Sequence, residues 1–241
     1  MKLHRRLIPM LLAIVLMLGN LPIGASAAAE AYDAGQISKR ELEFLLTFIN
    51  IPSAAFVICG VGENLLSSVQ MGIAVFASVL SSALFVGILG RFFFMRGTFT
   101  QKRSVSSFSR PFAASLPDAI RLAAKNMMSI CACVITFSAL SGTVCSLEPL
   151  ASAPQWIVAI VTGISEVSSG VREAAAVHGS AAPFLCAAIS SWSGLSVHMQ
   201  IISVCRGRGV SFLPFFISKL IQAFLSPCFL YLFCTLAKLQ L

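Results

Sequence analysis

The chain has 241 residues, of which 57% are hydrophobic and only 11% are charged. An ordinary soluble domain has about 25% charged residues, and a soluble fold of this size could not bury so much apolar surface. The composition therefore excludes a cytosolic globular enzyme and a disordered protein. The apolar residues come in continuous runs rather than in alternating ten-residue strands, which predicts an all-α polytopic membrane protein.

The net charge is +8, from 17 basic and 9 acidic residues. Seven of the basic residues lie between two long apolar runs, where only Asp118 opposes them: Arg91, Arg96, Lys102, Arg103, Arg110, Arg121 and Lys125. By the positive-inside rule this distribution predicts a basic cytoplasmic loop over residues 91–119. A nucleic-acid-binding surface would need aromatic residues among the charges on a soluble scaffold. We therefore expect the lipid bilayer as a partner, and no nucleic acid.

The eight cysteines lie inside or beside apolar runs and include no CxxC pair. This pattern indicates buried free thiols rather than a disulfide framework or a metal site. The sequence also has no GxSxG, no HExxH and no P-loop, and its three histidines favour no hydrolase triad. We expect no enzyme, no catalytic residue, no bound metal and no cofactor.

The first apolar stretches after the amino terminus do not form simple spans. Residues 1–29 have the basic start, apolar stretch and Ala-Ser-Ala box of a secretory signal peptide; we interpret them instead as the end of a membrane helix. Residues 44–61 contain Asn50 and Pro52 near the middle. Because proline removes a backbone donor, we expect a break there and a re-entrant segment.

The central part of the chain predicts one clean span and one short loop. Residues 70–90 have the length of a membrane helix. Pro111 and Pro117 are expected to end any helix before the next span, at residues 120–145. Residues 147–155 carry no basic residue, so we place them outside.

The last third predicts a re-entrant segment followed by two spans. Residues 156–164 are apolar but too short to cross alone, and a polar stretch follows, so we expect a re-entrant segment over 156–180. Residues 184–204 form a span interrupted by polar residues, and 205–211 a second inside loop. The final span is 212–236. The whole predicts about five to six membrane helices, some of them broken.

An internal similarity suggests a repeated-half architecture. Residues 18–26 resemble residues 193–199, and further along each copy the turns at 35–38 and 208–211 are also similar. Duplicated halves with interrupted helices at matching positions are typical of transporters, whose substrate sites lie at the interruptions. We therefore divide the chain into residues 1–90, the end of a first repeat with connecting helices, the loop 91–119, and a second repeat at 120–241. The chain then lacks the beginning of its first repeat.

Glu166 is the first candidate for a binding residue. A carboxylate that faces lipid costs about 2.5–3.5 kcal/mol on insertion scales, so we expect it to face a polar cavity. With Ser168, Ser169 and Gly170 it would bind a substrate or a coupling ion, H⁺ or Na⁺. The alternative is a loop carboxylate paired with Arg172. If Glu166 serves the site, Glu166→Gln should abolish transport.

Three further interruptions carry polar residues. In residues 193–200, Gly194 permits close backbone approach, and the polar neighbours offer hydrogen-bond donors: Ser193, Ser196, His198 and Gln200. Alternatively, these side chains bond their own helix or bridge helices. The other two interruptions are Asn50 with Pro52, and Asn20 with Pro22.

Lys219 is a charged residue within the last span, and its role has two interpretations. The favoured interpretation is that it extends toward the inner interface. The alternative is a fixed cation for an anionic substrate.

Residues 163–170 followed by 192–200 resemble the second half of YlbJ-type sporulation integral membrane proteins, which belong with the nucleoside-recognition, or Gate, domain proteins. Residues 48–58 and 19–25 extend the resemblance, and family members are usually longer. It implies a multi-pass transporter of a small molecule in endospore formation, with dipicolinate favoured over a nucleoside-like solute. It also implies a cell-membrane location, in the mother-cell or outer forespore membrane.

Other readings stay open. The chain could be a non-transporting membrane scaffold, or a fragment that needs a complementary N-terminal half. A homo-oligomer is a further alternative.

Overall fold

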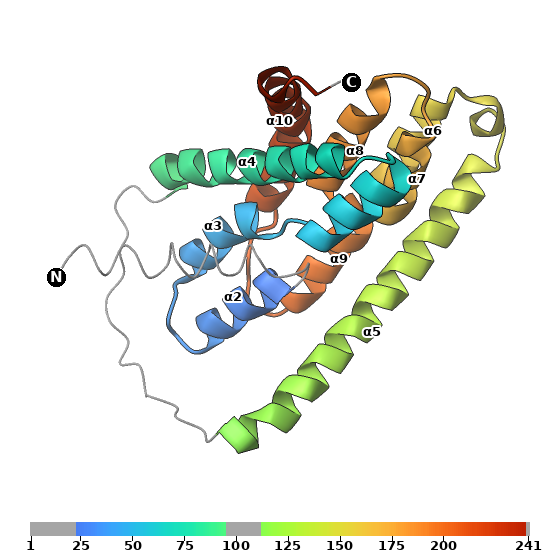
Figure 1. Cartoon of the computed structure of the whole chain (residues 1–241). Coiled ribbons are helices and arrows are strands. Elements are labelled where there is room, and N and C mark those ends of the chain that lie inside the picture. Colours follow the sequence, from blue (N-terminus) through green and yellow to red (C-terminus); the bar gives the residue numbers. More distant parts are fainter. Residues whose placement is uncertain (1–22, 95–111, 240–241) are drawn as a thin grey trace.

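The computed structural model describes residues 23–94 and 112–239, and every regular element in these two ranges is a helix (Figure 1). The all-α prediction is therefore confirmed for the described residues. Asn20 and Pro22, and most of the first copy of the internal similarity, lie outside them.

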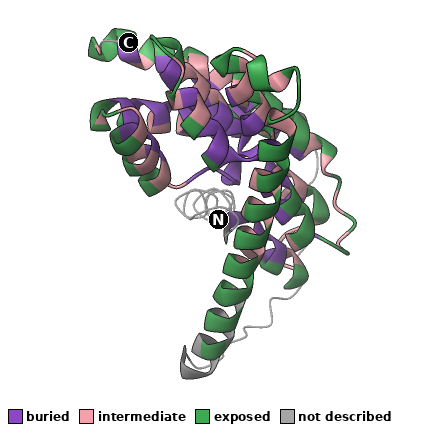
Figure 2. Cartoon of the chain, turned by 90° about the vertical axis from the view of Figure 1, so that its right-hand side faces the viewer, coloured by how far each residue is buried: buried purple, intermediate pink, exposed green. Residues whose placement is uncertain are grey.

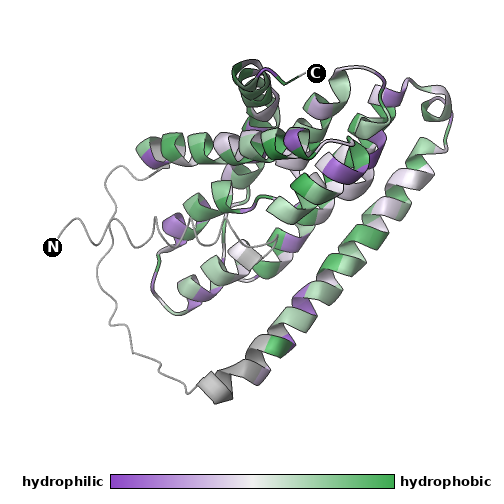
Figure 3. Ribbon diagram, in the orientation of Figure 1, coloured by the Kyte–Doolittle hydropathy of each residue, from purple (hydrophilic) through white to green (hydrophobic). Residues whose placement is uncertain are grey.

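Four segments are long and apolar enough to cross the ~30 Å hydrocarbon core of a bilayer: Val69–Phe92, Ala123–Cys145, Ala181–Val204 and Leu213–Ala237. Apolar residues run along most of α4 (Val69–Phe94) and α10 (Leu213–Ala237) (Figure 3). Two shorter apolar helices, Ala55–Leu65 and Gln155–Ser165, are the pieces that the sequence analysis counted among five to six membrane helices. The described residues thus have the character of a multi-pass membrane protein.

The first broken helix consists of α3 (Lys39–Ile49) and the π-helix η1 (Ala55–Leu65), and α2 (Ile23–Asp33) precedes it. Ser38 starts α3 through a capping box, in which its hydroxyl accepts a hydrogen bond from the Glu41 N–H and the Glu41 carboxylate accepts one from the Ser38 N–H. The helix ends at Asn50, two residues before Pro52, so the predicted break is confirmed.

The prediction that residues 44–61 are re-entrant is wrong. A Cβ on Gly90 would lie 3.2 Å from the Phe44 ring, and a Cβ on Gly72 would lie 2.8 Å from the Gly62 Cα. The late part of α4 thus lies against α3 and its early part against η1, which makes the two segments antiparallel over their whole length. The break at 50–54 interrupts the helix without reversing its direction.

The helix α5 (Phe112–Cys145) contains Pro117, which was expected to end any helix before it. That prediction is wrong because Pro117 lies only five residues after the helix start, where its missing N–H costs a single hydrogen bond. Helix therefore enters the predicted loop 91–119 from both sides. Most of α5 is exposed along its length (Figure 2).

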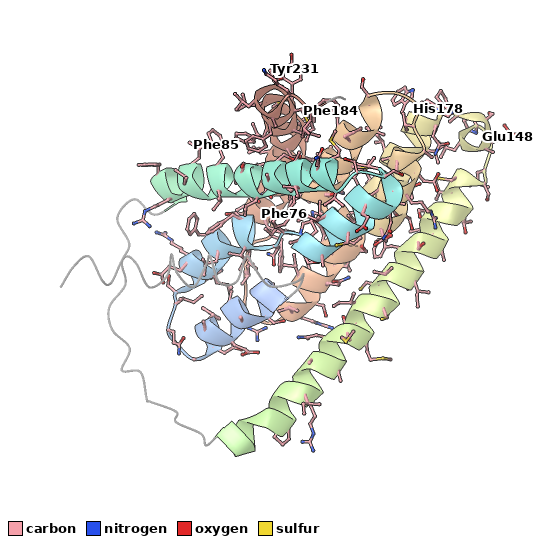
Figure 4. All side chains as sticks on the ribbon, viewed as in Figure 1. Phe76, Phe85, Glu148, His178, Phe184 and Tyr231 are labelled. Atoms are coloured by element: carbon pink, nitrogen blue, oxygen red, sulfur yellow. The ribbon has the colours of Figure 1, made fainter. Side chains whose placement is uncertain are left out.

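The helices α6 (Gln155–Ser165) and α7 (Val167–Ala175) form a hairpin, and a short helix η2 (Leu150–Ser152) precedes it. The Gln155 side-chain amide donates a 2.9 Å hydrogen bond to the Glu173 carboxylate, which joins the open ends of the hairpin. Glu148 and His178, which flank it in the chain, lie at the same end of the molecule (Figure 4). Eleven residues of α6 span ~16 Å, about half of the bilayer core. This is the shape that the predicted re-entrant segment 156–180 requires.

The second broken helix consists of α8 (Ala181–Trp192) and α9 (Gly194–Val204), as the polar interruption predicted. The last helix, α10, lies beside both of its halves: Ser226 bonds the Ala187 carbonyl of α8, and Phe215 contacts the His198 ring of α9.

The turns at 35–38 and 208–211 share a local form, since Gly35 (φ 69°) and Gly209 (φ 64°) are both left-handed shortly before a helix. A full repeated architecture stays a prediction.

Candidate solute site at three helix breaks

The break between α8 and α9 is made by two consecutive left-handed residues. Ser193 has φ 71° and Gly194 has φ 76°. A Cβ on Gly194 would lie 2.9 Å from the Val167 nitrogen and 3.0 Å from the Glu166 Cα, so only glycine allows the backbones to approach this closely. This contact joins the α8–α9 break to the tip of the α6–α7 hairpin.

Glu166 is the tip residue of that hairpin, and its side chain is fully buried. One carboxylate oxygen accepts a 2.9 Å hydrogen bond from the Ser168 N–H, and the other a 2.7 Å bond from the Ser169 N–H. The carboxylate therefore caps α7 at the positive end of its dipole. The alternative pairing with Arg172 is wrong, because Arg172 lies 3.7 Å from Glu173 instead.

The other predicted residues of this segment divide between two environments. The hydroxyl of Ser169 lies 2.9 Å from that of Ser138, which connects the hairpin to α5. Ser168 is exposed, and Gly170 touches the backbone of Gly163, where a Cβ would lie 2.2 Å from the Gly163 Cα. The structure thus gives Gly170 a packing role and leaves Ser168 outside the site.

Lys219 connects the break between α3 and η1 with the break between α8 and α9. Its ammonium donates to the carbonyl of Asn50 and, at 3.3 Å, to the carbonyl of Ser191. It also lies 3.4 Å from the Ser193 hydroxyl and 3.4 Å from the Gln222 side-chain oxygen. The side chain is fully buried, so the interpretation that it extends toward the interface is wrong.

The charge of Lys219 has no counter-ion among the described side chains. The ion pairs in these ranges are Lys39–Glu43, Arg172–Glu173 and Asp33–Arg208. Glu166 does not pair with Lys219, and both of its carboxylate oxygens accept hydrogen bonds from backbone N–H groups of α7. A buried ammonium with only neutral acceptors is expensive in free energy unless an anion joins it.

His198 presents one ring nitrogen to the same interior. Its Nδ1 lies 2.7 Å from the Gly194 carbonyl, and since a carbonyl only accepts, Nδ1 donates. In the neutral ring Nε2 is then a bare acceptor, and it has no partner among the described residues. The ring packs at a tilt against Trp192, at 4.4 Å between centroids, and against Phe215, at 4.9 Å.

Several buried polar atoms around these breaks have no hydrogen-bond partner in the described part of the chain: Asn50 Oδ1, Ser190 Oγ, Ser191 Oγ, Ser196 Oγ, His198 Nε2 and Gln200 Nε2. Buried polar groups are almost always bonded, and leaving one unsatisfied costs about 1–3 kcal/mol. All of these atoms are buried and lie at Asn50 or on α8 and α9. Their concentration makes this region the candidate binding site.

Printed contacts connect several of the predicted site residues: Gly194 touches Glu166, and Lys219 bonds Asn50 and lies beside Ser193. Further along α9, Ser196, His198 and Gln200 are buried, and Pro52 is buried after the first break. Sequence reasoning missed Thr47, Ser190, Ser191, Gln222 and Ser226. A signal was present on α10, where Lys219, Gln222 and Ser226 follow each other at helical spacing and are all fully buried. Gln222 donates a 2.7 Å hydrogen bond to the Thr47 carbonyl, so this polar face of α10 lies against α3.

In the described ranges no group of three or more histidine, cysteine, aspartate or glutamate side chains is arranged to hold a metal ion. Comparisons of the chain with protein-family models, with curated proteins and with solved structures find no match.

Proposed function

We propose that this protein is an integral membrane carrier that moves a small organic anion through the site at the three helix breaks. The observation that carries the proposal is the fully buried ammonium of Lys219, which is bonded only to neutral oxygens, two of them carbonyls of Asn50 and Ser191, whose own side chains carry unpartnered polar atoms.

The buried charge of Lys219 selects the class of solute. A carboxylate next to Lys219 would supply the missing counter-charge, and a charged pair with full hydrogen bonding offsets the desolvation that either ion alone incurs. The hydroxyls of Ser190 and Ser191 and the amide of Gln200 would donate to the anion. The His198 Nε2 would accept from a donor group on the solute.

The interrupted helices favour transport over a fixed scaffold. Discontinuous helices whose breaks meet near mid-depth are the usual construction of carrier sites, because the half-helices can move against one another. A scaffold has no need for a buried cation without a counter-ion, or for unsatisfied polar atoms at its centre.

The resemblance adds the biological setting. It implies endospore formation, a place in the mother-cell or outer forespore membrane, and dipicolinate as the first solute to test. A coupling ion, H⁺ or Na⁺, is part of the proposal. Because both oxygens of Glu166 already accept hydrogen bonds, we assign this residue to the positioning of α7 rather than to the ion.

The test is uptake of radiolabelled dipicolinate into proteoliposomes that contain the purified protein. We expect saturable uptake by the wild type and background uptake by Lys219→Met. The matched control is Ser218→Ala on the same helix, whose buried hydroxyl bonds only its own backbone, at Phe215. Uptake that is absent in the wild type, or that survives in Lys219→Met, contradicts the proposal. A parallel assay with uridine separates an anion carrier from a nucleoside carrier.

A further inference from the structure

Two hydrogen-bonded contacts join four helix ends at one end of the molecule. The guanidinium of Arg208 binds Asp33 through two nearly parallel bonds, Nε to Oδ1 at 2.9 Å and Nη2 to Oδ2 at 2.5 Å. Arg208 also donates to the carbonyl of Val204, the last residue of α9. The last residue of α2 is thereby tied to the end of α9.

The second contact ties α3 to α10. The backbone N–H of Ser211, two residues before α10, donates a 2.8 Å hydrogen bond to the Glu43 carboxylate in the first turns of α3. Lys39 lies 3.9 Å from the same carboxylate. We call the Asp33–Arg208 and Glu43–Ser211 contacts together the clasp.

The helices that the clasp joins are the ones that carry the candidate site. The helix α3 begins beside the clasp and ends at Asn50, whereas α9 begins at Gly194 and ends at the clasp. Lys219 is in the second turn of α10, close to the clasped end of that helix. Asn50 lies seven residues beyond Glu43 on α3, and Lys219 lies six residues beyond the start of α10, so the site and the clasp are ~10 Å apart along each of these helices.

Apolar side chains fill the space between the site and the clasp. Leu42 of α3, Ile201 and Cys205 at the end of α9, and Phe215 of α10 belong to one cluster, and none is more than 2% exposed. The clasp itself meets water, since the Asp33 side chain is 52% exposed. A solute at Lys219 can reach this face of the protein only if the apolar cluster parts.

The ion pair of the clasp is weak enough to break. A partly exposed ion pair favours its closed form only roughly two- to fivefold. It is also specific, because its two-pronged geometry and the Glu43–Ser211 bond fix how α2 and α3 sit against α9 and α10.

We propose that the clasp keeps a gate closed. The candidate site opens toward this face when α2 and α3 move away from the ends of α9 and α10, and the clasp holds these helices together. That the gate serves a solute rests on the proposed function. The gate predicts that weakening Asp33–Arg208 exposes the apolar cluster to water more often.

Cys205 is a native reporter for this opening. It is 1% exposed, belongs to the apolar cluster, and accepts a hydrogen bond at its carbonyl from the Arg208 N–H. A full-length variant with the other seven cysteines replaced by alanine, reconstituted in nanodiscs, would be labelled with a water-soluble maleimide. The measured quantity is the labelling rate of Cys205.

We expect Arg208→Gln to raise the labelling rate roughly two- to fivefold, the closed-state preference of such a pair. The charge swap Asp33→Arg with Arg208→Asp should return the rate toward that of the wild type, which separates gating from misfolding. Arg206→Gln is the matched control, because Arg206 is an exposed cation of the same loop with no ion pair among the described residues. An unchanged rate in Arg208→Gln, or an equal rise in Arg206→Gln, overturns the proposal.

The labelling experiment does not depend on transport. If labelling responds to the clasp but dipicolinate and other organic anions are not taken up, the moving contact stands and the proposed function fails. If uptake is saturable and needs Lys219 while labelling ignores the clasp, the proposed function stands and the gate fails.

Discussion

The ammonium of Lys219, on α10, donates a hydrogen bond to the backbone carbonyl of Asn50, at the break between α3 and η1. A helix that ends leaves carbonyl groups without an N–H partner, and in a bilayer no water replaces it. Here a buried cation satisfies one of these carbonyls. The same ammonium bonds the carbonyl of Ser191, which lies in α8 just before the break of the second broken helix. One side chain therefore connects the two interruptions.

Lys219→Met should remove anion binding without lowering stability. Methionine has a similar length and no charge, so the substitution removes the desolvation penalty of a buried ammonium, several kcal/mol. It leaves the Asn50 carbonyl unsatisfied, at a cost of about 1–3 kcal/mol. We therefore expect a thermal unfolding midpoint at or above that of the wild type, measured in detergent, together with loss of dipicolinate binding. A large drop in the midpoint would assign Lys219 to structure alone.

His198→Asn should distinguish the roles of the two ring nitrogens of His198. The asparagine amide can still donate to the Gly194 carbonyl, as Nδ1 does, but it has no atom at the place of Nε2. If Nε2 accepts a hydrogen bond from the solute, affinity should fall roughly tenfold, the equivalent of about 1.4 kcal/mol. His198→Gln, which can place its amide group near Nε2, should lose less. Binding measured by calorimetry checks this; equal affinities in all three proteins would remove His198 from the site.

Gly194→Ala should destabilise the protein severely. The substitution combines a left-handed backbone, at φ 76°, with a Cβ only 2.9 Å from the Val167 nitrogen. Gly179→Ala is the matched control, since Gly179 has φ 85° but no atom within 4 Å of its Cβ. The control isolates the backbone strain of about 1–2 kcal/mol. A thermal unfolding midpoint for Gly194→Ala no lower than that of the control would show that the hairpin and the α8–α9 break do not need this contact.

Glu166→Ala should weaken the hairpin more than Glu166→Gln does. Alanine removes both acceptors from the start of α7, a loss of about 1–2 kcal/mol for an N-cap, whereas glutamine retains one oxygen. Hydrogen exchange of the Ser168 and Ser169 amides, measured by mass spectrometry, reports this directly. If Glu166→Gln keeps the protection of α7 and still abolishes uptake, the charge itself serves transport.

Asp33 gives the clasp a defined pH dependence. The hydrogen bonds and charge of Arg208 lower the pKa of this carboxyl below its usual 3.8. A carboxyl whose pKa is lower in the folded state stabilises the fold above its unfolded pKa, and the contribution disappears as the pH falls through the folded value. The difference in unfolding midpoint between the wild type and Asp33→Asn should be constant from pH 7 to about 5, and shrink as the pH falls below 3.8 and through the lower folded pKa. A difference that grows on acidification would contradict the ion pair.

Much of the fold is predictable because the bilayer restricts the choices. Continuous apolar runs predict helices, and Pro52 together with the polar stretches at Glu166 and Ser193 predicts where helices break. Those breaks occur at the predicted places. The helix α5 departs from the expectation because a proline near a helix start costs one hydrogen bond rather than the helix.

The sequence by itself determined the class of protein, the places of its breaks and most of the polar residues near them, since these depend on local backbone chemistry and on hydropathy. It did not determine the direction of α3 and η1, which is set by the close approach of Gly72 to Gly62. Nor did it determine the position of the Lys219 ammonium. Only the tertiary structure decided that, because the acceptors come from Asn50 and Ser191, far away in the chain, and only packing brings their carbonyls to one buried place.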